Sequence, residues 1–175
     1  MDDQARFRAL FDAASTAVRR YAHHLGLNDS DAEDLAADVF TVAWRRLDAV
    51  PRDDAIPWLL AVARNHWRNH LRRTARALNL RQKLRGRPQS TCVEPELNDQ
   101  SELWHALQCL SARDREILLL IAWDDLSTQQ AAVVIGCSAA TARVRLHRAR
   151  NRLALAMSSS ETNTSAPTVM GVEQE

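Results

Sequence analysis

The chain has 175 residues, of which 46% are hydrophobic, and its 23 basic and 22 acidic residues leave a formal net charge of +1. Three scattered cysteines are not typical of a disulfide scaffold and fit a reducing compartment, and no apolar run approaches the ~18 residues of a membrane span. We therefore expect a cytoplasmic protein of one or two small domains, with no membrane insertion of its own.

The charge is strongly segregated along the chain. Residues 29–54 hold eight acidic residues, whereas residues 64–87 hold nine basic residues and no acidic one. Almost every basic residue is arginine, whose planar guanidinium suits phosphates and guanine edges. Such asymmetry indicates two different partners, one of them polyanionic.

The first third of the chain predicts helices. Apolar residues recur at helical spacing over residues 7–25, and Gly26 follows as a stop signal. The next helix is expected to begin at "SDAE", where Ser30 and Glu33 have the spacing of a capping box. Its apolar arc is wide, which favours packing on two sides.

A third helix is predicted after the break at Pro51 and Pro57. Leu60, Ala63, Trp67 and Leu71 are expected to face inward, while Arg64, Arg68 and Arg72 follow another face. The three helices together predict a small helical bundle over residues 1–75. Residues 76–100 turn from basic to acidic and contain Gly86, Pro88 and Pro95, so we expect a linker there.

Residues 101–157 predict a second helical domain. Ser111 is expected to cap one helix, and Ser127 with Gln130 has capping-box spacing at the start of a short helix that Gly136 ends. A basic helix then runs from Ser138 to about residue 157. The remaining residues, 158–175, are polar, and we expect them to be disordered. The predicted fold is all-α, with two small helical domains joined by a linker.

The two helices around Gly136 have the pattern of a helix-turn-helix. In that geometry the second helix lies in the major groove, and its early residues face base edges and phosphates. Spacing turns Ala142, Leu146, Ala149 and Leu153 toward the core. Arg150 and Arg152 lie further along the helix and are expected to meet phosphates or solvent. The residues expected within reach of DNA are Thr141, Arg143, Val144, Arg145, His147 and Arg148. The alternative interpretation is a basic amphipathic helix exposed only to solvent.

Three stretches of the sequence resemble a known family. "LSTQQAAVVIGCSAATARVRLHRARNRL" (residues 126–153) resembles the C-terminal DNA-binding domain of bacterial sigma factors of the extracytoplasmic-function group. "DAEDLAADVFTVAWRRL" (residues 31–47) and "IPWLLAVARNHWRNHLRR" (residues 56–73) resemble their N-terminal domain. The resemblance implies a factor that binds core RNA polymerase and directs it to promoters, under the control of an anti-sigma protein.

The resemblance also implies residue roles. On the helix that would dock on core polymerase lie Asp34, Asp38, Phe40, Trp44 and Arg45. Residues 48–57 would approach a flipped-out base of the downstream (−10) promoter element. The strand and phosphates of that element would be held by Arg64, Asn65, Arg68, Arg72 and Arg73. The basic helix that starts at Ser138 would read the upstream (−35) element.

Two other functions compete with this interpretation. A helix-turn-helix regulator would bind duplex DNA without binding core polymerase as a sigma factor. A zinc-dependent hydrolase is the third hypothesis, because His66 and His70 have a spacing that can bind zinc. These histidines lack a nearby third ligand and lie among arginines that would repel a cation. The sequence offers no nucleophile with a matched base and no phosphate-binding glycine loop, so we expect no enzyme activity, metal or cofactor.

Overall fold

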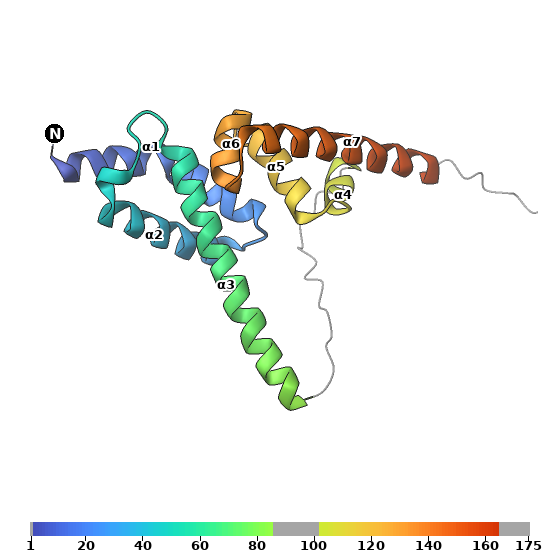
Figure 1. Cartoon of the computed structure of the whole chain (residues 1–175), viewed down its shortest axis with the longest axis horizontal. Coiled ribbons are helices and arrows are strands. Elements are labelled where there is room, and N and C mark those ends of the chain that lie inside the picture. Colours follow the sequence, from blue (N-terminus) through green and yellow to red (C-terminus); the bar gives the residue numbers. More distant parts are fainter. Residues whose placement is uncertain (1, 86–101, 165–175) are drawn as a thin grey trace, which may run out of the picture.

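The computed structural model describes residues 2–85 and 102–164, with the side chains of residues 2–76 and 103–158. Over these residues the chain is helical and has no strand, which confirms the predicted all-α class. The elements, shown in Figure 1, are α1 (Asp3–His24), α2 (Asp29–Arg45), the 3₁₀ turn η1 (Leu47–Ala49), α3 (Ala55–Arg85), α4 (Glu102–Gln108), α5 (Ala112–Ala122), α6 (Thr128–Ile135) and α7 (Ala139–Thr164).

The N-terminal half consists of α1, α2 and α3, which pack against one another in pairs. Val18, Val39, Leu59 and Leu60 are fully buried between these helices. The predicted capping box of α2 is wrong, because Asn28 is the N-cap and its side-chain oxygen accepts from the Asp31 backbone N–H at 2.9 Å. Ser30 instead lies within the first turn, where its backbone is already helical.

The C-terminal half consists of α4 to α7, and its predicted helix signals are confirmed. The Ser111 side chain caps α5, and Ser127 with Gln130 forms a reciprocal capping box on α6. Gly136 ends α6 at φ +73°, a left-handed conformation in which a glycine avoids the strain of a side chain. The turn at Gly136 leads directly into α7, which gives the helix-turn-helix arrangement.

Two helices extend further than the sequence indicates. α3 continues through Arg85, past the boundary expected at residue 75, and Figure 1 shows it projecting away from the bundle. Leu71 is therefore 48% exposed instead of facing inward, since the bundle has ended by that point. α7 continues through Thr164, beyond the end expected near residue 157; the remainder of the predicted tail, residues 165–175, lies outside the described residues.

The two halves are in contact. α3 packs on α6, α1 touches α5, and the buried apolar residues of both halves belong to one cluster. The sequence left the relative placement of the halves open. Within the described part of the chain, the helix-turn-helix is seated against the N-terminal bundle by its first helix, and α7 lies on the side away from that bundle (Figure 1).

Candidate nucleic-acid interface

The exposed surface of α7 depends on small residues beneath it. Ala142 and Ala149 are fully buried and Leu146 is nearly so, which fixes one face of the helix against α5 and α6. The opposite face carries the residues predicted to contact DNA: Thr141, Arg143, Val144, His147 and Arg148 are exposed, and Arg145 is partly exposed. The structure therefore brings all six to the surface of one helix.

The start of α7 is fixed by a local hydrogen-bond pair. Ser138 accepts from the Thr141 backbone N–H at 3.1 Å, and the two hydroxyls lie 2.9 Å apart. Beyond this cap the surface is hollowed, and the hollow is lined by Asp114, Ala140, Thr141, Val144, Arg145, Arg148 and Arg152. A concave surface rich in guanidinium groups at the first turns of a recognition helix suits a phosphate or a base edge.

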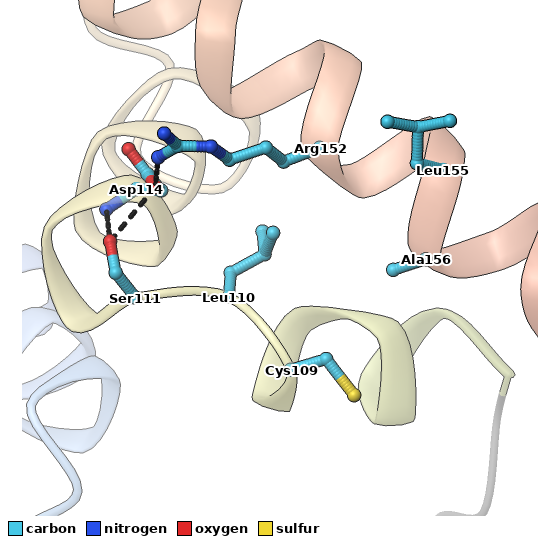
Figure 2. Close-up of a pocket in the computed structure, with 7 residues that line it drawn as sticks. All are labelled: Cys109, Leu110, Ser111, Asp114, Arg152, Leu155 and Ala156. Atoms are coloured by element: carbon cyan, nitrogen blue, oxygen red, sulfur yellow. Dashed lines mark hydrogen bonds and ion pairs between the residues drawn. The ribbon is translucent and has the colours of Figure 1, made fainter.

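Arg152 has an acidic partner that the sequence did not reveal. Figure 2 shows its guanidinium directed at the carboxylate of Asp114, to which it donates a hydrogen bond. Asp114 is only 5% exposed, and its Oδ2 also accepts from the Ser111 hydroxyl at 2.8 Å. Arg152 therefore links α7 to the start of α5. Its guanidinium pairs with a carboxylate, where the sequence led us to expect phosphate or solvent.

The aromatic surface of α2 is built jointly with α1. Asp34, Asp38 and Arg45 are exposed, and Trp44 is 49% exposed, as a docking surface requires. Phe40 is only 4% exposed and lies beneath the surface, 4.7 Å from the ring of Phe11. Phe40 therefore supports this surface from below rather than forming part of it.

α1 contributes two aromatic residues, Phe7 and Phe11, to which the sequence interpretation assigned only helical spacing. Phe11 is 44% exposed, and the partly buried ring of Phe7 makes an edge contact with Trp44 at 5.1 Å. Their spacing of four residues was visible in the sequence, but the same spacing is typical of core residues. We call Phe7, Phe11, Phe40 and Trp44 the aromatic patch.

Most of the predicted DNA-binding residues of α3 are exposed to solvent. Asn65, Arg68, Arg72 and Arg73 are exposed. On the same helix, the rings of Trp67 and His70 are stacked with centroids 5.4 Å apart and planes within 7°. Trp67 is partly buried, and its planar stack adds an aromatic element to a basic helix, a combination found in single-stranded nucleic-acid sites.

Arg64 differs from the other basic residues of α3, because it is 8% exposed. Its Nε donates to Glu116 Oε1 at 2.6 Å, its Nη2 to Glu116 Oε2 at 3.0 Å, and its Nη1 to the Ile135 carbonyl at 2.9 Å. The structure therefore does not place Arg64 on the open face with Arg68 and Arg72. An acid from α5 and the last carbonyl of α6 occupy its guanidinium in this arrangement.

The environment of Glu116 shifts the pKa of its neighbours. Burial raises the pKa of Tyr21 well above its usual value of 10.0, and the charge of Glu116 and the 2.8 Å hydrogen bond from the phenol raise it further. Burial alone would lower the pKa of Arg64, but the hydrogen bonds and charge of Glu116 outweigh it and raise this pKa. Both shifts favour a protonated phenol and a charged guanidinium around one carboxylate.

The loop of residues 48–57 also reaches the C-terminal half. Arg52, Asp53 and Asp54 are exposed, as a loop that meets a base requires. Asp54 Oδ1 accepts a hydrogen bond of 2.7 Å from the side chain of Gln130, at the start of α6. One edge of this loop therefore touches the helix-turn-helix.

The histidine pair considered for zinc is engaged elsewhere. His66 Nδ1 lies 3.4 Å from Asp38 Oδ2, and His70 stacks on Trp67. Among the residues that the structure describes, no group of three His, Cys, Asp or Glu side chains is arranged to hold a metal ion. None of the helices searched over those residues is both long and apolar enough to cross a bilayer.

The chain is similar to known proteins over nearly its whole length. Residues 10–77 match sigma-70 region 2, and residues 100–153 match sigma-70 region 4. The extracytoplasmic-function (ECF) RNA polymerase sigma factor SigL of Mycobacterium tuberculosis is 31% identical, over 89% of this chain and 90% of SigL. The RNA polymerase sigma factor NccH of Alcaligenes xylosoxydans xylosoxydans is 29% identical, over 91% and 90% of the two chains.

Solved structures agree with these matches. The sigma factor RpoE of Bartonella quintana, solved in complex with the anti-sigma factor NepR, superposes with a TM-score of 0.68 and 28% identity, over 87% of this chain and 96% of RpoE. CnrH, solved in complex with the cytosolic domain of CnrY, gives a TM-score of 0.60 and 25% identity, over 93% and 91% of the two chains. The chain belongs to the sigma-70 family of RNA polymerase sigma factors, in the extracytoplasmic-function group.

Proposed function

We propose that this sigma factor joins core RNA polymerase through α2 and reads a promoter with two separate basic surfaces. The observation that carries the proposal is the exposed face of α7, with six predicted DNA-contacting residues above a buried row of Ala142, Leu146 and Ala149. Such a helix, held from behind and following a glycine turn, has the geometry of a major-groove reader. Its predicted target is the upstream (−35) element.

Core polymerase is the proposed partner of α2. The aromatic patch leaves Phe11 and Trp44 about half exposed, and Asp34, Asp38 and Arg45 lie on the same helix as Trp44. Exposed aromatics flanked by charges are typical of protein-binding surfaces, in which a few large side chains carry most of the binding energy. A regulator that acted on DNA alone would have no need for this surface.

The downstream (−10) element is the proposed ligand of α3 and of the loop at residues 48–57. Strand opening without ATP requires cations for phosphates and surfaces for unstacked bases. Arg68, Arg72 and Arg73 supply exposed cations, and the Trp67–His70 stack lies on the same helix. In this role the protein is an initiation factor and not an enzyme by itself, and it works in the cytoplasm with the polymerase.

An anti-sigma protein is a further proposed partner. RpoE of Bartonella quintana was solved with the anti-sigma factor NepR, and CnrH with the cytosolic domain of CnrY. The similarity of this chain to both, over most of its length, supports the same kind of control here. The partner's identity would follow from co-purification with the intact chain.

The proposal is tested by transcription with purified core polymerase and a promoter library. We expect specific transcripts only when the protein is added, and we expect Trp44→Ala to abolish most of them. Trp123→Ala is the matched control, because Trp123 is 48% exposed and lies in the other half of the molecule. Binding of duplex DNA without any effect on core polymerase would favour the alternative, a helix-turn-helix regulator.

A further inference from the structure

Two clusters of buried polar side chains lie where the two halves meet. In the first, Glu116 of α5 accepts hydrogen bonds from both Tyr21 of α1 and Arg64 of α3. The side chains of Arg64 and Glu116 are only 10% and 13% exposed, so this ion pair is largely withdrawn from water. We call Tyr21, Arg64 and Glu116 the interdomain latch.

The second cluster surrounds Asp124, which follows α5 just after its C-cap, Trp123. The side chain of Asp124 is fully buried, and its Oδ1 accepts from Arg20 Nε at 2.7 Å. Its other oxygen lies 3.3 Å from His24 Nδ1. Arg20 and His24 both belong to α1, so the side-chain contacts of this carboxylate, like those of Glu116, come from the opposite half of the molecule.

The contacts of Arg64 have a chemical meaning beyond packing. A carboxylate that meets a guanidinium through two parallel hydrogen bonds presents two oxygens in the same way as a phosphodiester does. Arg64 belongs to the basic row of α3, but its guanidinium N–H groups already donate to Glu116 and to the Ile135 carbonyl. Ile135 lies next to the turn of the helix-turn-helix. The same guanidinium cannot bind a phosphate at the same time.

We propose that the interdomain latch is an autoinhibitory contact, in which Glu116 takes the place of a nucleic-acid phosphate on Arg64 and holds the two halves closed. The nucleic-acid part of this inference rests on the function proposed for α3. Opening of the latch frees Arg64 to join Arg68 and Arg72, and it releases α6 from α3.

The Arg64–Glu116 ion pair is expected to add little net stability to the closed arrangement, so the contact can open at a small cost in free energy. Desolvation of two charges offsets most of their attraction, so a buried ion pair contributes little net stability while it fixes geometry strongly. A partner that offers Arg64 a phosphate replaces the lost carboxylate with an equivalent ligand. Removal of Glu116's charge alone leaves Arg64 unpaired in the interface, which favours separation of the halves.

The test measures the distance between the halves in the free, full-length protein. Spin labels carried by unnatural amino acids replace the exposed residues Thr41 of α2 and Ala154 of α7, which leaves the native cysteines in place. We expect a narrow distance distribution for the parent protein and a broader one, shifted to longer distances, for Glu116→Gln. Asp12→Asn is the matched control, because it removes one exposed carboxylate from α1 and is expected to keep the narrow distribution.

A second variant keeps the test decisive if Glu116→Gln lowers helix content in circular dichroism. Arg64→Lys retains the positive charge but loses the two-pronged geometry, and we expect it to broaden the distribution as well. An unchanged distribution in the folded variants would overturn the proposed latch. This readout contains no polymerase, so failure of the transcription assay alone would count against the proposed function and not against the latch.

Binding of DNA gives the second readout. We expect Glu116→Gln to bind a single-stranded oligonucleotide about fivefold more tightly than the parent, because apparent affinity rises with the fraction of molecules competent to bind. Asp12→Asn removes the same charge, so its affinity measures the purely electrostatic gain. Equal affinities for the two variants would contradict the inference that Glu116 competes with phosphate for Arg64.

Discussion

The two basic helices, α3 and α7, carry similar rows of arginine but use them differently. On α7, Arg143, Arg148 and Arg150 remain exposed, because the residues that face the core are mostly small and keep the helix close to its neighbours. On α3, Arg64 is buried against an acid from the other half, whereas Arg68 and Arg72 are open. The position of an acid on a distant element thus decides whether an arginine in such a row forms part of a surface or an internal contact.

The largest expected difference separates Arg64 from Arg68. Arg64→Ala leaves the carboxylate of Glu116 without its ion-pair partner at the contact between the halves, and we expect it to lower the free energy of unfolding by up to about 3 kcal/mol. Arg68→Ala removes an exposed cation and is expected to change it by less than about 0.5 kcal/mol. Urea denaturation of both variants measures these values, and equal losses would contradict the distinction between the two arginines.

On α7, the corresponding comparison is between the stability losses caused by replacing Arg152 and Arg150. Arg152 is half exposed and pairs with the buried Asp114, so we expect Arg152→Ala to cost about 1 kcal/mol of stability. Arg150 is exposed, and its replacement by alanine is expected to be nearly neutral for folding. Thermal unfolding of the pair provides the check; a larger loss for Arg150→Ala would show that α7 is held in a different way.

Helix capping gives a smaller effect, and the test compares the observed cap of α2 with the cap that the sequence predicted. Asn28→Ala removes the cap of α2 and is expected to cost up to about 1 kcal/mol, while Ser30→Ala should cost only a few tenths. Chemical denaturation of the two variants distinguishes them. The reverse order would restore Ser30 as the N-cap that the sequence predicts.

The smallest effect concerns the pH dependence of the latch. The pKa of Tyr21 is higher in the folded protein than in the unfolded chain, so the folded state retains this proton at pH values at which the unfolded chain loses it. The stability due to Tyr21 is therefore fully present below about pH 10 and declines as the pH rises above it. Tyr21→Phe should unfold with a shallower loss of stability in this alkaline range, and an identical slope for both proteins would contradict the contact with Glu116.

The sequence predicts features that lie within one helix better than features that join two. Ala142, Leu146 and Ala149 were placed in the core from spacing alone, and Ser127 was paired with Gln130, because each set belongs to a single helix or its cap. The ion pairs Arg64–Glu116 and Arg152–Asp114 were missed, since their partners lie 52 and 38 positions apart. Spacing along a helix says which face a residue occupies but not what the rest of the fold places against it.

Two differences between the expected and the observed exposure of residues in the N-terminal half have the same physical origin. Phe40 was expected on the docking surface, but the rings of Phe7 and Phe11, from another helix, cover it. Leu71 was expected in the core because its spacing continues that of Leu60 and Ala63, yet α3 has left the bundle by that point. In both cases tertiary packing, and not periodicity, set the exposure.

We propose that this one chain joins core polymerase to DNA and opens the duplex. Permanganate footprinting of a promoter fragment, selected with this protein, tests it most directly because unpaired thymines react. We expect reactive thymines at the downstream element only when core polymerase and this protein are both present, without ATP. A fully paired duplex under those conditions, while the protein alone protects the same fragment, would contradict it.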